Sequence, residues 1–520
     1  MERVIEELIS PKFSVQCRFK RGVRLGVTNL DWGATSRPLS VVEEAVKGGA
    51  WMDYGNPNSC GTITAVTSSK IIEDTRTKVR DHVLHDPWNY SVEFGGEGST
   101  FWLEKFPSLF SPQTHSVICI QRELHNSLVQ PWISGGFPIF QPPNSIASYM
   151  VWFERRLKWI REIEGKTPIV LLSLSSHVTG GILRAGELEP LFEKTDVIIL
   201  DATCYLTHEK KIPPMRFDLA VFSGHKLPGG PGSPGVVLYH PKYQNPLGGG
   251  TGTRNVLGIS KLREAIALRT RLLASNSEKK ERDNLRGDLD NILRLTPENK
   301  FLETLFPLLW DTDEIYETSR RHPIYSFIIK HGRYTIHPDI IADLMLNIFG
   351  FQIRVGAQCS DFSIPGRDIH QFTPEEWLET AAMEDPIMQP SVCRISIPDY
   401  LLSPSLVDRL EAAIRTITVF GHYMVKCYTI SEGKWNEAPD LTFYMGKIGD
   451  DIQKGKRVGC GACSFLENTV ETAERSNDAF DVNAILPRLL DFHSGIQSDG
   501  NYFRNPYRWF CHPRDKPLDD

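Results

Sequence analysis

Long apolar runs are missing from this sequence: no stretch of its 520 residues is apolar enough to span a bilayer. Residues 1–7 carry acidic side chains and no apolar core, which argues against a secretory signal peptide. Cysteine is scarce, with 10 residues scattered along the chain, which excludes a disulfide scaffold and favours a reducing environment. The sequence therefore predicts a cytoplasmic protein that is not inserted in a membrane.

Neither sign of charge dominates, and the formal net charge is only -6. This balance gives no electrostatic reason to expect nucleic acid or an anionic membrane as a partner. Fixed-period repeats and low-complexity tracts are also missing. The hydrophobic fraction of 41% and the charged fraction of 23% are those of an ordinary globular protein. Because 520 residues exceed one hydrophobic core, two or three domains are expected.

Short β-rich runs alternate with helical stretches between residues 40 and 300. The clearest strands are residues 116–120 and 169–174, and the clearest helices are residues 149–164 and 259–275. This alternation predicts an α/β architecture in which helices cover a parallel or mixed sheet. From about residue 305 the pattern indicates a smaller α+β unit, with strands at 322–329 and 351–355 and helices at 338–349 and 406–418.

One lysine stands between two glycine clusters: residues 222–231 read Phe-Ser-Gly-His-Lys-Leu-Pro-Gly-Gly-Pro, with Lys226 at the centre. Upstream, the apolar run 197–200 ends in Asp201, and a second short strand, 219–222, precedes the lysine. This arrangement suits pyridoxal phosphate (PLP). The lysine amine forms a Schiff base with the cofactor aldehyde, and the aspartate keeps the pyridine nitrogen protonated. The alternative is a surface lysine in a Gly/Pro loop, and motifs elsewhere in the chain are needed to choose between the two.

Further segments occur in the order and form of one known family. Residues 30–35 resemble Leu-Asp-x-Ala-Ala-Thr, with Gly33 in place of the first alanine, and residues 54–59 resemble Gly-Asn-Pro-x-Ser. Residues 124–132 resemble Glu-His-x-Ser-Asn-x-x-Pro-Trp. On these motifs, residues 30–417 resemble the class V, fold-type I PLP-dependent aminotransferase family, nearest to its cysteine desulfurase and selenocysteine lyase branch.

The resemblance implies a fold-type I PLP-transferase. Its large domain has a mostly parallel, seven-stranded sheet sandwiched by helices, and a smaller α+β domain follows. On this basis we expect an N-terminal segment joining the small domain (1–40), a large PLP-binding domain (41–300), a small C-terminal α+β domain (301–420) and an extension of unknown role (421–520).

The resemblance also implies residues that bind the cofactor phosphate. The turn at 94–100 lies between a strand and a predicted helix at 101–106, where backbone N–H groups and hydroxyls bind phosphate. Ser223 and His225 match phosphate-binding positions beside the lysine, and residues 248–251 resemble a segment that reaches the partner subunit's phosphate. This last feature implies an active site built across a homodimer, although a flexible loop is the alternative. The predicted phosphate-binding residues are Gly98, Ser99, Thr100, Ser223, His225 and Thr251.

Three residues are expected around the cofactor ring. His125 would stack on the ring and relay protons, unless it is an ordinary core histidine. His177 stands where the family has an asparagine that donates a hydrogen bond to the ring oxygen, and a histidine can donate too. Cys204 replaces a glutamine that reaches the same oxygen, and a thiol is only a weak donor. These two departures leave the reaction type open.

The substrate residues come from both ends of the region of resemblance. Ala34, in the opening motif, would reach the substrate pocket. Residues 392–396 resemble a Cys-Arg-x-Ser strand, in which Arg394 would clamp the substrate carboxylate in two parallel hydrogen bonds. A structural ion pair is the alternative for this arginine.

Residues 350–359 resemble Gly-Ile-x-Val-Arg-x-Gly-x-x-Cys, a motif that adds Arg354 to the substrate site and ends in Cys359. In cysteine desulfurases this cysteine attacks the substrate sulfur and carries a persulfide, which needs an accessible thiolate. The Ser-Asp-Phe that follows here departs from the family.

A single Cys-x-x-Cys, Cys460 to Cys463, is weak support for a metal because tetrahedral zinc takes four ligands. Other candidate ligands in the extension, Cys427, Cys511 and His512, are irregularly spaced. No metal site is predicted.

The sequence thus predicts a homodimeric PLP-dependent transferase or lyase that acts on an amino acid through a Lys226 Schiff base. The leading hypothesis is a cysteine desulfurase-like C–S lyase in which Cys359 accepts sulfur and passes it to an acceptor protein. One alternative is a class V aminotransferase, β-lyase or epimerase without sulfur transfer. The other is a catalytically inactive PLP-fold scaffold or binding protein.

Overall fold

The computed structural model describes residues 2–9, 13–16, 24–59, 61–86, 89–142, 148–244, 252–274, 279–293, 302–304, 315–331, 334–360, 391–425, 428–431, 434–437, 444–445 and 491–492. Within these ranges, no helix has the length and apolarity that crossing a membrane requires. Several positions singled out in the sequence lie outside the described residues: 248–250, Thr251, Cys427, Cys460, Cys463, Cys511 and His512.

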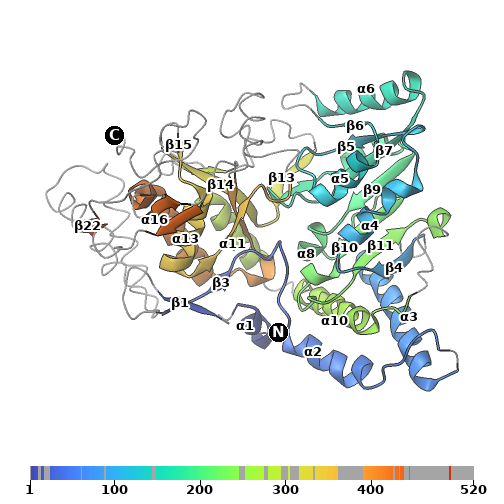
Figure 1. Ribbon diagram of the computed structural model, residues 1–520, viewed down its shortest axis with the longest axis horizontal. Coiled ribbons are helices and arrows are strands. Elements are labelled where there is room, and N and C mark those ends of the chain that lie inside the picture. The colour runs from blue at the N-terminus through green and yellow to red at the C-terminus, as the bar shows by residue number, and fades with distance from the viewer. Residues whose placement is uncertain are drawn as a thin grey trace.

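A seven-stranded mixed sheet forms the larger part of the fold (Figure 1). Five neighbouring strands run parallel, whereas β11 is antiparallel to both of its neighbours, β10 and β4. The sequence prediction of an α/β architecture with seven strands is confirmed. In sheet order the strands are β4 (Ser91–Gly95), β11 (Gly235–Tyr239), β10 (Leu219–Ser223), β9 (Val197–Asp201), β7 (Thr167–Ser173), β5 (His115–Cys119) and β6 (Ile139–Phe140).

Both faces of this sheet are buried, so its central strands are continuous apolar runs. Alternate side chains point to opposite faces: Ile169 and Leu171 of β7 belong to one core, and Val170 and Leu172 to the other. Helices α4 and α5 cover the first face, and α3, α6, α7 and α10 the second. Their bounds are α3 (Ile63–Val83), α4 (Thr100–Leu103), α5 (Asn126–Ser134), α6 (Tyr149–Glu162), α7 (Ala185–Phe192) and α10 (Val256–Leu272).

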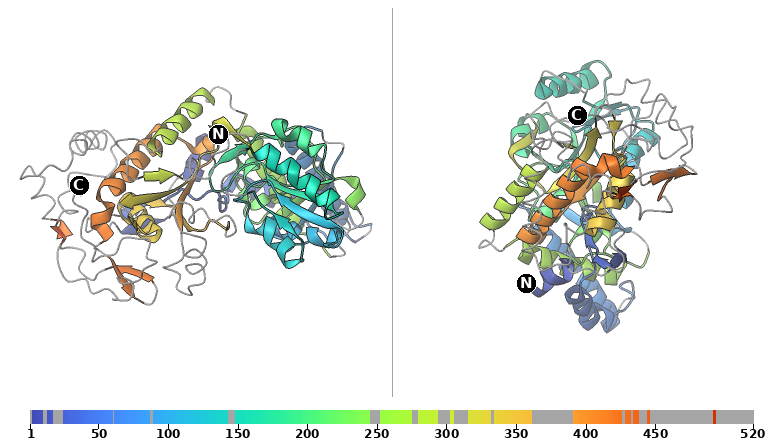
Figure 2. Two further views of the ribbon diagram at one scale, coloured as in Figure 1. Left: turned by 90° about the horizontal axis from the view of Figure 1, so that it is seen from above. Right: turned by 90° about the vertical axis from the view of Figure 1, so that its left-hand side faces the viewer.

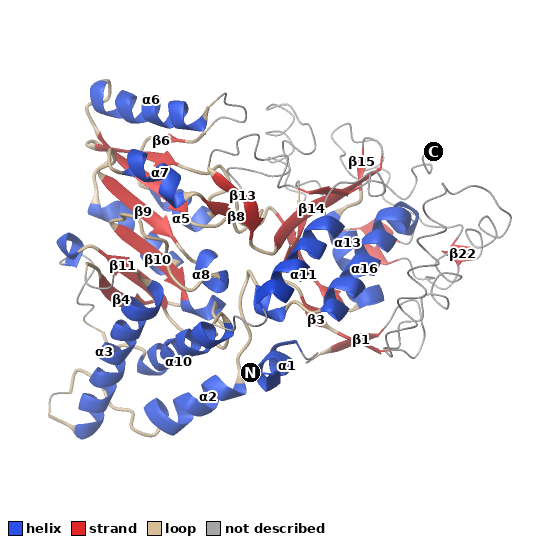
Figure 3. Cartoon of the chain, turned by 180° about the vertical axis from the view of Figure 1, so that it is seen from behind, coloured by secondary structure: helices blue, strands red, loops and turns tan. Residues whose placement is uncertain are grey.

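A second, antiparallel sheet has its own hydrophobic core, and Figure 3 shows its strands as a separate group. Its strands are β12 (Leu302–Thr304), β14 (Ile324–His331), β18 (Val392–Ser396) and β17 (Arg354–Gly356), with β15 (Tyr334–Thr335) beside β14. Helices α11 (Lys279–Ile292) and α16 (Pro404–Met424) pack against each other, as Figure 2 shows, and α13 (Pro338–Phe349) contacts α16.

The N-terminal part of the chain reaches this second region. Strand β3 (Thr28–Asn29) pairs in parallel with β16 (Phe351–Gln352), and Asp31 bridges to Ser396 of β18.

The remaining elements are α1 (Glu2–Ile9), β1 (Ser14–Gln16), β2 (Arg24–Gly26), α2 (Ser40–Val46), η1 (Lys47–Trp51), η2 (Phe106–Leu109), β8 (Gly181–Leu183), α8 (Tyr205–His208), η3 (Gly224–Lys226), η4 (Pro241–Tyr243), β13 (Tyr316–Arg321), η7 (Asp399–Leu401), β19 (Tyr428–Ser431), β20 (Lys434–Glu437), β21 (Tyr444–Met445) and β22 (Asp491–Phe492).

Two predicted elements differ from the observed ones. The helix expected at 101–106 is divided into the one-turn helix α4 and the 3-10 helix η2, in which Pro107 occupies the first turn. The strand expected at 351–355 is divided at Ile353, because its two halves pair with different strands, β16 with β3 and β17 with β18. The sequence located both segments, but Pro107 sets the bounds of the first, and the pairing partners set those of the second.

Candidate active site

Most of the predicted site residues follow the carboxyl ends of strands in the seven-stranded sheet. Asp201 is the last residue of β9, and Lys226 ends the short helix η3 directly after β10. The glycines beside the lysine are required by packing: a Cβ on Gly224 would lie 2.7 Å from the Pro234 carbonyl oxygen, and one on Gly230 would lie 2.1 Å from that of Gly224. The turn is therefore tightly packed, which holds Lys226 in place.

Lys226 is partly buried, and its surroundings shift the pKa of its amine. Desolvation lowers the pKa of Lys226, and the nearby Arg394 and Arg354 lower it further, while Cys204 and Asp201 raise it. Burial raises the pKa of Asp201, against hydrogen bonds from Thr203 and the charge of Lys226, which lower it. The Thr203 N–H donates to Asp201 Oδ1 at 2.8 Å. The result is a lysine with an increased neutral fraction near a fixed carboxyl group.

Polar groups from three strand ends converge around Gly98. The Ser99 N–H donates to Ser223 Oγ at 2.9 Å, and the two serine hydroxyls lie 2.9 Å apart. The Thr203 hydroxyl reaches Ser99 Oγ at 3.4 Å. A Cβ on Gly98 would lie 3.3 Å from Ser223 Oγ and 3.4 Å from His225 Nε2. These groups form a cluster of donors, here called the Gly98 cluster, whereas Thr100 is exposed.

His225 is oriented by a residue that the sequence reasoning missed. Its Nδ1 lies 3.1 Å from Thr35 Oγ1, which leaves Nε2 on the side of Gly98. Burial and the neighbouring Lys226 lower the pKa of His225 to about 4. Thr35 belongs to the opening motif and Thr203 to the segment after β9, but no local pattern distinguishes them from other threonines.

His125 caps the N-terminus of α5. Its Nδ1 accepts from the Ser127 N–H at 3.2 Å and lies 2.8 Å from the Ser127 hydroxyl, so the ring proton is assigned to Nε2. Burial lowers the pKa of His125 to about 3, assisted by Lys226, Arg354 and Arg394. The ring is therefore neutral, and its edge meets the ring of His177 at a centroid distance of 5.0 Å.

His177 and Cys204 both make contacts within the protein. His177 Nε2 lies 2.9 Å from the carbonyl oxygen of Gln358 and 3.1 Å from Ser360 Oγ. Cys204 is buried, with its Sγ 3.8 Å from Ser175 Oγ. Burial raises the pKa of the Cys204 thiol, although Lys226 opposes this shift.

Arg394, on β18, is 1% exposed and forms an ion pair. Its Nη2 donates to Asp31 Oδ1 at 2.7 Å, and its Nη1 donates to the His177 carbonyl oxygen at 3.1 Å. Its Nε is buried and has no hydrogen-bond partner among the described residues. Desolvation lowers the pKa of Arg394, and Asp31 raises it. The role of Arg394 as a carboxylate clamp stays a prediction.

The opening motif contributes Asp31, which the sequence reasoning did not select. A Cβ on Gly33 would lie 2.7 Å from Ser396 Oγ and 3.3 Å from Arg394 Nη2, so the glycine lets this turn approach β18. The Ala34 N–H donates to the Asp31 carbonyl oxygen at 3.3 Å, which places Ala34 in the same turn.

Cys359 lies on a turn in contact with α5. Gln358 and Cys359 both have left-handed backbone conformations, with φ of 59° and 60°. The Asn126 N–H donates to the Cys359 carbonyl oxygen at 2.8 Å, and Arg354 Nη2 donates to Cys359 Sγ at 2.8 Å. The structure thus brings the sulfur beside Arg354, next to the helix that His125 caps.

No protein-family model and no curated protein sequence matches the chain. Solved structures do match. A NifS-like protein superposes with a TM-score of 0.56 at 19% identity, over 76% of this chain and 100% of its own. A NifS-like protein from Rickettsia africae ESF-5 has a TM-score of 0.56 at 16% identity, over 75% and 99%. The apo cysteine desulfurase from Thermococcus onnurineus NA1 has a TM-score of 0.57 at 16% identity, over 75% and 94%. At these identities the chain shares the fold of NifS-like proteins.

Proposed function

We propose that this protein is a PLP-dependent enzyme acting on an amino acid, with Lys226 as the residue that carries the cofactor. The observation that carries this proposal is a partly buried lysine of lowered pKa on a packed turn, with the Asp201 carboxyl group at the end of the neighbouring strand. When bound, PLP supplies an aldehyde that forms an imine with an amine and a ring that accepts electrons from the substrate α-carbon.

The residues present fit this cofactor. The Gly98 cluster supplies the hydroxyl groups of Ser99, Ser223 and Thr203 and the Ser99 N–H, together with His225 Nε2, around a glycine that leaves the backbone open to an anion. Asp201 supplies a buried carboxylate partner for a protonated ring nitrogen. Thr203 links the two, because its N–H donates to Asp201 Oδ1 and its hydroxyl reaches Ser99 Oγ of the cluster.

The other residues then have distinct tasks. Lys226, with its lowered pKa, accepts the proton of the substrate α-carbon as a neutral amine. His125 presents its Nε2–H beside the site, because Ser127 fixes Nδ1 as an acceptor. Arg394 uses two of its five N–H donors on Asp31 and His177, and its remaining donors bind the substrate carboxylate.

We further propose that the reaction is a cysteine desulfuration with Cys359 as sulfur acceptor. The Cys359 thiolate attacks the substrate sulfur, and an S–S bond forms as the C–S bond breaks. The electron pair returns to the substrate carbon, which takes up a proton and leaves as alanine. Arg354 places a cation beside the attacking sulfur, and the half-buried position of Cys359 leaves its persulfide open to an acceptor thiol.

Release of alanine and sulfide from L-cysteine tests this proposal. The PLP-loaded protein, with a reductant present, is expected to release the two in equal amounts. Cys359→Ala should lower both rates at least about 100-fold, because no thiolate remains to take the sulfur. Cys119→Ala, which removes a core cysteine on β5, is the matched control and should retain the wild-type rate.

Other outcomes of this assay contradict parts of the proposal. Release that persists in Cys359→Ala would remove the persulfide mechanism and leave a PLP-dependent lyase. A yellow, PLP-bound protein that releases neither product would favour an aminotransferase or epimerase. A protein that stays colourless with added PLP would favour a scaffold.

Homodimer formation is part of the proposal, and an exposed apolar surface supports it. Five apolar side chains around η1 and the start of α3 are between 47% and 86% exposed. We call them the Trp51 patch: Trp51, Met52, Tyr54, Ile63 and Val66. Exposed apolar patches of this kind mark interaction sites. The uncharged segment 54–59, which resembles a family motif, begins at Tyr54 of the patch, and its neutrality suits a self-complementary contact with a second copy.

Replacing Trp51 and Met52 together by glutamate should convert the dimer to a monomer. Two charges in an apolar contact should weaken self-association at least about 100-fold, because each would be desolvated without a partner. Sedimentation velocity at micromolar concentration measures the change. Ile163→Glu, which alters an exposed apolar residue at the end of α6, should leave the dimer intact. A monomeric wild type would contradict this prediction.

A further inference from the structure

The turn that carries Cys359 is held in place at three successive residues. The Gln358 carbonyl oxygen lies 2.9 Å from His177 Nε2, and the Cys359 carbonyl oxygen accepts from the Asn126 N–H at 2.8 Å. The Ser360 hydroxyl donates to the Glu123 carbonyl oxygen at 3.1 Å. Left-handed conformations at two consecutive non-glycine residues are unfavourable and persist only where the surroundings hold them. These contacts therefore determine where the Cys359 sulfur lies.

Of these three contacts, only the one from His177 is donated to the turn by a side chain outside it, and the partners of His177 fix its tautomer. The Gln358 carbonyl can only accept, so the proton lies on His177 Nε2. The Ser360 hydroxyl gives its hydrogen to Glu123, so its oxygen also accepts from Nε2 at 3.1 Å.

The other ring nitrogen of His177, Nδ1, has no proton to donate. Burial lowers the pKa of His177 well below its ordinary value, and the charges of Arg394 and Lys226 and the neighbouring His125 add to this effect. The ring is therefore neutral, with one N–H, and Nδ1 carries a lone pair. A neutral His177 that donates to Gln358 can only accept a hydrogen bond through Nδ1.

We propose that His177 is a positioning residue for Cys359, and that it does not donate a hydrogen bond to the cofactor ring oxygen. This replaces the role expected for it from the sequence. The inference rests on the proposed function for the chemical role of Cys359. The hydrogen bond between His177 and Gln358 is formed without cofactor or substrate. It makes the location of the sulfur depend in part on one N–H group, in the turn that follows β7.

Paired substitutions of His177 separate its two nitrogens. The amide nitrogen of a glutamine extends from the backbone about as far as histidine Nε2, and that of an asparagine about as far as Nδ1. The amide N–H of His177→Gln can therefore still donate to the Gln358 carbonyl oxygen. The amide N–H of His177→Asn lies where Nδ1 was and does not reach that oxygen. Alkylation of Cys359 by iodoacetamide in the cofactor-free full-length protein, followed by peptide mass mapping, reports how firmly the turn is held.

We expect His177→Asn to alkylate Cys359 about tenfold faster than the wild type, the effect of losing one buried hydrogen bond. His177→Gln should stay within about twofold of the wild type. The buried Cys393 serves as an internal reference in each digest: its protection shows that the variant has folded. Should His177→Asn fail to fold, His177→Gln still tests the proposal: alkylation of Cys359 that is about tenfold faster in that variant would show that a donor at the position of Nε2 does not hold the turn.

An unchanged rate in His177→Asn, or an equal increase in both His177 variants, would overturn the proposal. Because the measurement needs neither cofactor nor turnover, its failure is distinct from that of the proposed function. Sulfide release that is lost in Cys359→Ala, together with unchanged alkylation in His177→Asn, would support the desulfurase and reject the positioning role.

Discussion

Replacing Lys226 by alanine should abolish turnover and the visible absorption of bound cofactor. The proposed function gives this amine two tasks, because it carries the cofactor and accepts the substrate proton. We therefore expect the rate to fall by about 10⁴-fold, the upper end of what a general base contributes. Absorption spectra after dialysis against PLP-free buffer, together with the rate on L-cysteine, measure both losses.

Lys158→Ala is the matched control, since this lysine on α6 is 71% exposed and its ion pair with Glu162 lies in solvent. It should retain both the colour and the rate. A Lys226→Ala protein that stays yellow after dialysis would contradict the assignment.

The lowered pKa of Lys226 adds a second readout. Its neutral amine is the reactive form, so uptake of PLP by the cofactor-free protein should persist to a lower pH than reaction of PLP with an ordinary lysine.

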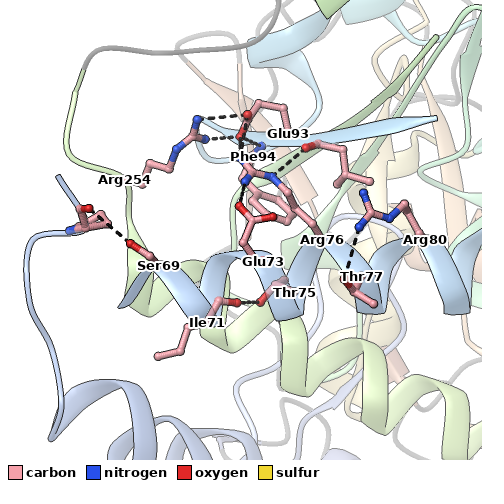
Figure 4. A network of polar contacts seen from close by, with 12 residues as sticks. Ser69, Ile71, Glu73, Thr75, Arg76, Thr77, Arg80, Glu93, Phe94 and Arg254 are labelled. Atoms are coloured by element: carbon pink, nitrogen blue, oxygen red, sulfur yellow. Dashed lines mark hydrogen bonds and ion pairs between the residues drawn. The ribbon is translucent and has the colours of Figure 1, made fainter. Parts of the chain in front are cut away.

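Replacing Glu93 by glutamine should lower the free energy of unfolding substantially. Glu93, on the edge strand β4, is 5% exposed and joins two arginines from different elements (Figure 4). Arg76 of α3 contacts its two oxygens at 3.1 and 2.9 Å, and Arg254, which precedes α10, contacts Oε2 at 3.1 Å and also Oε1. The carboxylate thereby links β4, α3 and the start of α10.

Removing this carboxylate leaves two guanidinium groups without their shared partner. Loss of one member of a buried ion pair costs about 3–5 kcal/mol, and we expect about 3 kcal/mol here because the arginines remain 18% and 22% exposed. Urea unfolding followed by tryptophan fluorescence measures the change. Lys194→Ala, which breaks an exposed pair with Glu154, should change the midpoint little. An unchanged midpoint in Glu93→Gln would show that the network contributes nothing to stability.

Much of the fold could be predicted from the sequence because its signals are local. The apolar run 197–200 and the helix at 338–349 were located from periodicity alone, and the latter matches α13 at both ends. The proximity of Asp201 and Lys226 was predictable for a related reason: each follows a strand, and parallel strands bring their carboxyl ends to one edge. The division of residues 351–355 between two strands could not be predicted, because it depends on distant partners.

The hydrogen-bond partners within the candidate site were not predictable in this way. Arg394 meets Asp31 across 363 positions, His177 meets Gln358 across 181, and His225 meets Thr35 across 190. The sequence supplied the chemical groups, because a lysine, a carboxylate or a thiol has the same chemistry wherever it is placed. The tertiary structure decided which nitrogen of His177 carries the proton and how many donors of Arg394 stay free. Those properties depend on hydrogen bonds that form only after distant segments have packed together.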